Sequence, residues 1–209
     1  MWSNIFNPEN RFFRGLGKAV DVAAFSLLWL AGTATVALFG PSTTALYDAM
    51  ARSLRKGEAG AYWRYFDTLK SNFKTACPVG VLVLTLYGGL YILHGWLLAG
   101  AAEGDQARYI LYVSFWIFLI VFAGTAAYLF PTLSRFEFGP GGLIAVSLRL
   151  AMAHLPTTLL LGGMTLLFAG AVVLMWWPGL FLPYLWARLA CPLLERIFKP
   201  FMEKQGKSL

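Results

Sequence analysis

The chain has 209 residues, of which 58% are hydrophobic and 13% are charged, and its formal net charge is +7. Soluble domains are near half apolar and about a quarter charged, so this composition excludes an ordinary globular core. No basic patch stands apart from the apolar runs, as a nucleic-acid interface would require. The sequence therefore predicts an all-α, polytopic membrane helix bundle, with residues 1–209 in a single integral membrane domain and no nucleic-acid partner.

The N-terminal part of the chain contains the first predicted membrane span. Residues 1–19 mix aromatic and basic side chains, which suits an anchor in the membrane interface or a poorly ordered terminus. The uncharged apolar run that follows, residues 22–39, would be about 27 Å long as a helix, close to the roughly 30 Å hydrocarbon core. We expect this run to cross the membrane.

A Gly-Pro-Ser-Thr-Thr turn at residues 40–44 predicts a break after this span. Gly40 and Pro41 disfavour continued helix, and Ser42 or Thr43 can accept a hydrogen bond from the free amides of a new helix. The turn would then mark the level at which lipid gives way to water.

Two amphipathic helices are predicted within residues 42–75, between the first and second spans. In residues 45–56 apolar side chains recur every three or four positions, while Asp48 and Arg52 pair on the other face. Residues 61–75 repeat this design, and a cytoplasmic platform on the membrane surface is expected; a solvated helical hairpin packed on the bundle is the alternative. The basic residues expected to face anionic lipid are Arg52, Arg55, Lys56, Arg64, Lys70 and Lys74.

Four further spans are predicted from long apolar runs. They cover about residues 76–99, 109–130, 157–177 and 180–194. An acidic loop with Glu103 and Asp105 joins the second span to the third, and Pro131 is expected to stop the third span. The last run is the shortest.

The distribution of basic residues predicts the orientation. With five spans, four of the seventeen Lys and Arg residues lie on one side and thirteen on the other, which places the N-terminus outside and the C-terminus in the cytoplasm. If residues 22–44 dip in and return, sixteen lie inside and only Arg108 outside. A crossing is favoured because lipid-exposed irregular backbone is unfavourable at membrane depth.

Ionisable residues inside the predicted spans are candidates for function. Arg188 would begin about 12 Å along the last span, and Glu195, seven residues later, could share its face. A polar contact of these two residues with a neighbouring helix or another subunit is predicted. His94, in the second span, is interpreted as a packed or interfacial residue.

The sequence contains no pattern typical of an enzyme or a metal site. It has no Walker lysine loop, no HExxH motif and no close carboxylate cluster, and two histidines with two distant cysteines do not make a zinc site. We therefore expect a protein that is not an enzyme, with no catalytic, cofactor-binding or metal-binding residues.

Several motifs resemble the YesL-like family of small bacterial membrane proteins. They are Leu-Leu-Trp-Leu at residues 27–30, Gly-Pro-Ser-Thr-Thr-Ala-Leu-Tyr at 40–47, Tyr-Phe at 65–66 with Lys-Ser-Asn-Phe-Lys at 70–74, and Leu-Pro-Thr-Thr at 155–158. The resemblance covers roughly residues 11–199. It implies a helical protein with several spans in the plasma membrane of Gram-positive bacteria, usually encoded beside carbohydrate ABC importers. It transfers no catalytic residue, because the family has been described as of unknown function.

The expected function is that of a non-enzymatic accessory or regulatory subunit associated with the permease of a carbohydrate ABC importer. The alternatives are a small transporter or channel-like protein acting alone, and a membrane-surface scaffold that recruits a soluble partner through residues 42–75. The oligomeric state is left open. The residues expected at partner or packing contacts are Gly40, Pro41, Ser42, Thr43, Leu46, Tyr47, Arg188 and Glu195.

Overall fold

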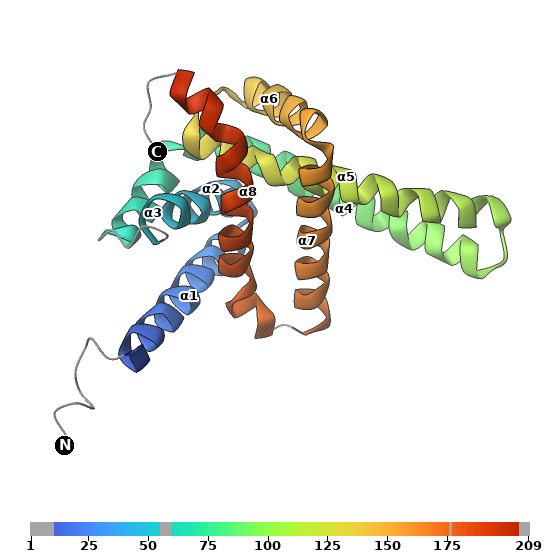
Figure 1. The fold of residues 1–209 in the computed structure, drawn as a ribbon. Helices are drawn as coiled ribbons and strands as arrows, with labels where there is room; N and C mark the ends of the chain where they lie inside the picture. The colour runs from blue at the N-terminus through green and yellow to red at the C-terminus, as the bar shows by residue number, and fades with distance from the viewer. Residues whose placement is uncertain (1–10, 55–59, 176, 205–209) are drawn as a thin grey trace.

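The computed structural model describes residues 11–54, 60–175 and 177–204, and these ranges are helical with no strand. The all-α prediction is confirmed. Figure 1 shows the arrangement of the helices. The elements are α1 (Arg11–Thr33), η2 (Val36–Leu38), α2 (Phe39–Ala49), η3 (Met50–Leu54), α3 (Ala61–Ser71), α4 (Phe73–Ala102), α5 (Gln106–Arg135), α6 (Pro140–Ala153), α7 (Leu155–Leu174), η4 (Trp177–Leu180) and α8 (Leu182–Lys204).

Three of the described helices are long and apolar enough to cross a membrane: α4, α5 and α7. They contain 30, 30 and 20 residues, and they correspond to the predicted spans 76–99, 109–130 and 157–177. The predicted stop at Pro131 is wrong, because α5 continues through this proline to Arg135. These three helices support a membrane location.

The helices α4 and α5 pack together as a long hairpin that projects beyond the rest of the molecule (Figure 1). At its tip, the Asp105 carboxylate caps α5 by accepting hydrogen bonds from the amides of Ala107 and Arg108. The Arg108 guanidinium also lies 4.6 Å from the centre of the Trp96 ring. These local contacts hold the tip, because the outer part of the hairpin extends away from the other helices.

The third apolar helix, α7, crosses α5 instead of running along the hairpin (Figure 1). Two glycines permit a close approach at the crossing: a Cβ on Gly124 would collide with the Thr158 carbonyl, and a Cβ on Gly162 would collide with the Ile120 carbonyl. The three apolar helices are therefore not arranged as a parallel bundle.

The first predicted span, residues 22–39, is not one helix. The helix α1 ends at Thr33, and the hydroxyls of Thr33 and Thr35 donate to the carbonyls of Leu30 and Gly32 near this break. The apolar part of α1, Val20–Thr33, is too short to be a candidate span; at 1.5 Å per residue it measures about 21 Å. A continuous helix over residues 22–39 is therefore wrong, whereas the crossing of the membrane by this segment, like the alternative in which it returns, stays a prediction.

The helix α2 lies at the centre of the described structure, in contact with α1, α3, α4, α5 and α8. Nine of its eleven residues are buried, so its predicted position on the membrane surface is wrong. The predicted break at Gly40 and Pro41 is also wrong, because both lie in the first turn of α2. Gly40 serves packing instead: a Cβ there would collide with the Ala76 carbonyl and the Phe130 ring.

The predicted capping of this helix by Ser42 or Thr43 is not observed. Residue Leu38 occupies the N-cap position and makes no side-chain capping bond. The hydroxyl of Thr43 instead donates back to the Phe39 carbonyl one turn earlier, at 2.7 Å. The second amphipathic segment also differs from its predicted bounds, because α3 ends at Ser71 and α4 begins at Phe73.

The last predicted span, residues 180–194, is part of a longer helix that is not a candidate span. The helix α8 runs from Leu182 to Lys204 and continues through Pro192 and Pro200. Its Glu195 is buried, whereas Arg188, Arg196, Lys199 and Glu203 are exposed. The helix is therefore amphipathic, with its buried face packed on the core.

Candidate functional site

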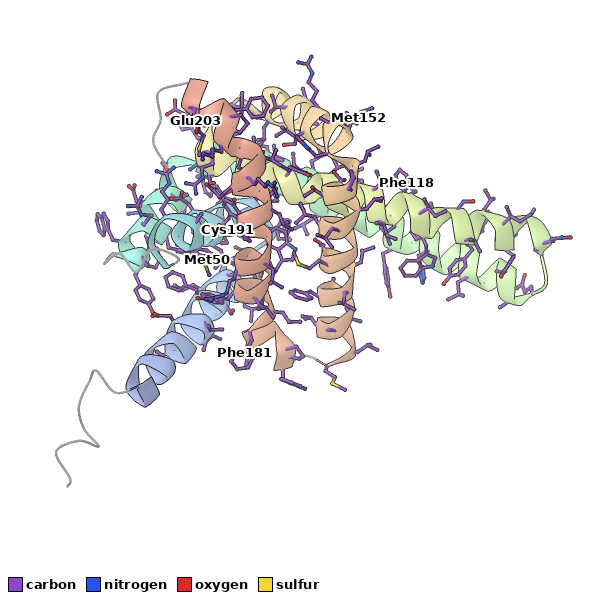
Figure 2. The ribbon with its side chains drawn as sticks, viewed as in Figure 1. Met50, Phe118, Met152, Phe181, Cys191 and Glu203 are labelled. Atoms are coloured by element: carbon purple, nitrogen blue, oxygen red, sulfur yellow. The ribbon has the colours of Figure 1, made fainter. Side chains whose placement is uncertain are left out.

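Four charged side chains from three parts of the chain meet, and three of them are buried. They are Asp48 on α2, Arg52 on η3, Arg135 at the end of α5 and Glu195 on α8, and we call them the charge cluster. Figure 2 shows α8 against the core, with the buried Cys191 labelled one turn before Glu195. The cluster joins helices that are far apart in the sequence.

Arg135 is the central residue of the charge cluster. Its Nε atom donates to Glu195 Oε1 at 2.8 Å, its Nη2 atom forms an ion pair with the same oxygen at 2.7 Å, and its Nη1 atom donates to Asp48 Oδ1 at 3.3 Å. The three guanidinium nitrogens thus have carboxylate partners on two helices. Bonds of this kind, between ionised groups, are the strong ones in proteins, and here they fix the end of α5 between α2 and α8.

Asp48 holds the second half of the cluster. Its Oδ1 atom lies 2.7 Å from Arg52 Nε, and its Oδ2 atom accepts a 2.9 Å hydrogen bond from the Thr68 hydroxyl of α3. The Nη2 atom of Arg52 donates to the Ser134 carbonyl at 3.0 Å. Arg52 belongs to the π-helical turn η3, and such turns are frequent at functional sites. This turn connects Asp48 to the end of α5.

Tyr47 adds a neutral hydrogen-bond donor to the cluster. Its hydroxyl donates to Glu195 Oε1 at 3.1 Å, and the Arg135 guanidinium carbon lies 5.9 Å from the centre of its ring. Burial, reinforced by the negative charge of Glu195, raises the pKa of Tyr47 well above its usual value of 10. Tyr47 therefore stays protonated and donates at all physiological pH values.

The burial of these charges decides what the cluster can do. The side chains of Asp48, Arg135 and Glu195 are 5%, 6% and 10% exposed, whereas Arg52 is 43% exposed. Buried charges are expensive unless they are paired, and removal of one partner leaves the other uncompensated. The negative charges of two carboxylates are neutralised by two guanidinium groups. This arrangement fits a cluster that holds helices together better than it fits a catalytic centre.

A pocket of about 680 Å³ opens beside the charge cluster. It is lined by Arg52, by Ser71, Asn72 and Thr75 at the junction of α3 with α4, and by residues 133–139 at the end of α5 and the following loop. We call it the Arg52 pocket. It lies where the long apolar helix α4 begins and α5 ends.

Most of the residues predicted at partner or packing contacts pack inside the chain. Gly40, Pro41, Ser42 and Leu46 are buried within the chain itself. The hydroxyl of Thr43 accepts a 3.0 Å hydrogen bond from the Trp29 indole and is half-buried. These positions serve the packing of α2 and present little surface to another protein.

The predicted relationship between Arg188 and Glu195 is not observed, because the two side chains lie in different environments. Arg188 is exposed, whereas Glu195 is buried and binds Arg135 and Tyr47. The polar contact predicted for Glu195 with a neighbouring helix is present, and its partners lie on α5 and α2.

The basic residues predicted to face lipid differ in their exposure and in their contacts. Lys70 and Lys74 are exposed, Arg64 is half-buried, and Arg52 contributes to the charge cluster. Arg55 and Lys56 lie outside the described residues.

Sequence reasoning missed Arg135 and the burial of Asp48. The pairing of Asp48 with Arg52 predicted from their spacing is present, but Asp48 is buried and does not lie on a surface. One signal was present: Arg135 is the first charged residue after the apolar run of α5, and a charge at a helix end can turn inward as well as outward. The sequence holds no direct signal for its partner sixty residues later.

The described residues contain no group of three or more His, Cys, Asp or Glu side chains able to hold a metal ion. His94 lies on the hairpin among the rings of Tyr112, Phe115 and Trp116, with Nε2 3.5 Å from the Tyr112 hydroxyl. This aromatic setting matches the predicted packed histidine.

Comparison with known proteins gives one match. Residues 22–93, about a third of the chain, match the family described as "Protein of unknown function, DUF624", to which YesL belongs. The matched region runs from α1 to the middle of α4 and includes Asp48 and Arg52 but not Arg135 or Glu195. The chain has no significant match among curated proteins or among solved structures.

Proposed function

We propose that the chain is a YesL-like accessory subunit that is not an enzyme and packs in the plasma membrane against the permease of a carbohydrate ABC importer. The proposal places the C-terminus in the cytoplasm. Its genomic context comes from the resemblance of residues 40–47 and 70–74 to the YesL-like family. Its physical basis is the α4–α5 hairpin.

The hairpin supports the proposal because it presents a large apolar surface away from the other helices. Tyr91 and Ile92 on α4 and Ile117 on α5 are 79%, 74% and 65% exposed, and the side chains beyond the crossing with α7, near Phe118, point outward (Figure 2). Lipid alone can cover such a surface, and the transmembrane helices of a permease would dock on it through close van der Waals packing.

The charge cluster supports a structural role over transport by this chain alone. Its buried charges pair with each other, and the charged residues described on α4, α5 and α7 lie near the helix ends: Lys74, Arg108 and Arg135. A transporter would need a polar pathway near the middle of the membrane. The described apolar helices provide no charged residue there.

The proposal is tested by site-specific photocrosslinking in cells. A photoreactive amino acid at Tyr91 should give an adduct with the importer permease, and the same group at Val173, an 85% exposed residue of α7, is the matched control. Co-purification of the tagged chain in mild detergent should recover the same permease. No permease by either method, together with normal oligosaccharide uptake in a deletion strain, would overturn the proposal.

A second candidate, a membrane-surface scaffold, is favoured by one observation on α3. Trp63, Tyr62 and Phe66 are exposed on this helix, and Lys70 is exposed near its end. Because α2 is buried, a soluble partner would contact α3. Trp63→Ala should then abolish recruitment of that partner and leave the permease adduct from Tyr91 unchanged.

A further inference from the structure

The Arg52 pocket has the size of a ligand site and is lined by both polar and apolar side chains. Its volume of about 680 Å³ lies within the usual range for ligand sites. One wall is polar, with hydroxyl and amide groups of Ser71, Asn72 and Thr75, and the other contains Leu133, Phe136 and Phe138. A ligand that fills this pocket has a polar part and an apolar part.

Position in the fold distinguishes between a soluble metabolite and a lipid as this ligand. Thr75 lies one residue before the apolar run of α4, and the pocket residues 133–139 follow the apolar run of α5. If α4 and α5 cross a bilayer, this is the depth at which phospholipid headgroups lie. In that arrangement the pocket lies at the level of the headgroups.

The charges of the pocket select among headgroups. Arg52 lines it with a side chain that is 43% exposed and has five N–H donors. Its buried Nε atom lies 2.7 Å from Asp48 Oδ1 and its Nη2 atom donates to the Ser134 carbonyl, so its Nη1 atom keeps free donors. Glu137 lines it with an exposed carboxylate that has no ion-pair partner among the described residues. The two carboxylates and two guanidinium groups of the charge cluster cancel. Glu137 adds one negative charge, so the cluster and Glu137 together carry no excess positive charge that would favour an anionic headgroup.

We propose that the Arg52 pocket binds the headgroup of a zwitterionic phospholipid with a primary amine, of the phosphatidylethanolamine type. The phosphate accepts hydrogen bonds from the free donors of Arg52, and the ammonium group donates to Glu137. The hydroxyl and amide groups of residues 71–75 complete the polar shell. This site requires no partner protein and is independent of the importer proposal.

The test uses the purified full-length chain in neutral detergent with added lipid of matched acyl chains. In phosphatidylcholine three methyl groups replace the N–H donors of phosphatidylethanolamine, so the comparison tests the contact with Glu137 when it is made in the parent and in Glu137→Gln. Native mass spectrometry or the lipid-dependent shift of the unfolding temperature measures binding. We expect phosphatidylethanolamine to bind roughly threefold to tenfold more tightly than phosphatidylcholine.

Three variants locate the site. Glu137→Gln, at an exposed position, should remove the preference for the primary amine and retain binding of the phosphate. Gly139→Phe should block the pocket, because Gly139 lines it, has an ordinary φ of −71° and has open space at its Cβ position. Gly141→Phe is the matched control: its Cβ position is also open and it does not line the pocket.

The outcomes separate clearly. Loss of the preference in Glu137→Gln and of binding in Gly139→Phe, with Gly141→Phe like the parent, supports the site. Equal binding of the two lipids by the parent, binding restricted to phosphatidylglycerol, or unchanged binding by Gly139→Phe overturns it. Soluble glycerophosphoethanolamine serves as the last arm: binding as tight as that of the lipid would overturn the assignment to a membrane lipid.

Discussion

Arg135 Nη2 lies 2.7 Å from Glu195 Oε1, and this buried pair joins the end of α5 to the middle of α8. The same guanidinium reaches Asp48 on α2, so one side chain ties three helices together. The relationship explains why an arginine at the end of an apolar helix turns into the protein.

We predict that Arg135→Met lowers the free energy of unfolding by about 3–5 kcal/mol, because Glu195 and Asp48 would remain buried with less compensation. The unfolding temperature in detergent measures the loss. Lys199→Met is the control, since the exposed pair of Lys199 with Glu203, at 3.9 Å, contributes at most about 1 kcal/mol. Equal unfolding temperatures for Arg135→Met and the parent would contradict the assigned role of the charge cluster.

We predict that Tyr47→Phe changes the stability of the protein at high pH. The raised pKa of folded Tyr47 means that only the unfolded state releases this proton as pH rises above about 10. The free energy of unfolding therefore falls above pH 10 in the parent, and below that pH this group contributes no slope. Tyr47→Phe should show a smaller fall between pH 10 and 12 in chemical unfolding experiments. An unchanged slope would show that Tyr47 already ionises in the folded protein.

The two neighbouring glycines of α7 should respond differently to the same substitution. Gly162→Ala places a Cβ against the Ile120 carbonyl and should cost about 1–3 kcal/mol, because the backbones of α5 and α7 must separate. Gly163→Ala adds the same methyl group in open space and should be neutral or slightly stabilising. Similar unfolding temperatures for the two variants would mean that the helices do not cross at Gly162.

The two ends of the α4–α5 hairpin should lie on opposite sides of the membrane. Arg108 is the only Lys or Arg between Thr75 and Pro131, so the positive-inside rule places the tip outside and the Arg52 pocket on the cytoplasmic side. In a background with Cys77→Ser, an impermeant thiol reagent should label Glu103→Cys in intact cells. It should label Lys70→Cys only after permeabilisation, and the reverse pattern would invert the topology.

Much of the helical content followed from composition and from run length. Three apolar runs predicted α4, α5 and α7, because a helix that satisfies its own backbone hydrogen bonds is the natural form of such a run. One boundary predicted from a proline is wrong, because Pro131 lies inside α5; Pro192 and Pro200 likewise lie inside α8. Local steric rules could not reveal that packing would sustain these helices.

The central position of α2 could not be read from its sequence. Its apolar stripe and its Asp48–Arg52 pair are equally typical of a surface helix, and the difference depends on Arg135 and Glu195, which lie far along the chain. Gly40 illustrates the same limit, since its proximity to the Ala76 carbonyl arises from tertiary packing and not from a turn.

The distance of sixty residues between Arg135 and Glu195 also has a consequence for biosynthesis. At about 5–20 residues per second, a ribosome needs roughly 3–12 s to add Glu195 after Arg135 has been made. During that interval the α4–α5 hairpin is complete, but its guanidinium has only Asp48 as a carboxylate partner within the cluster. Release from the insertion machinery before α8 has emerged would leave the hairpin inserted with Arg135 lacking Glu195, so the charge cluster is complete only after α8 has been made.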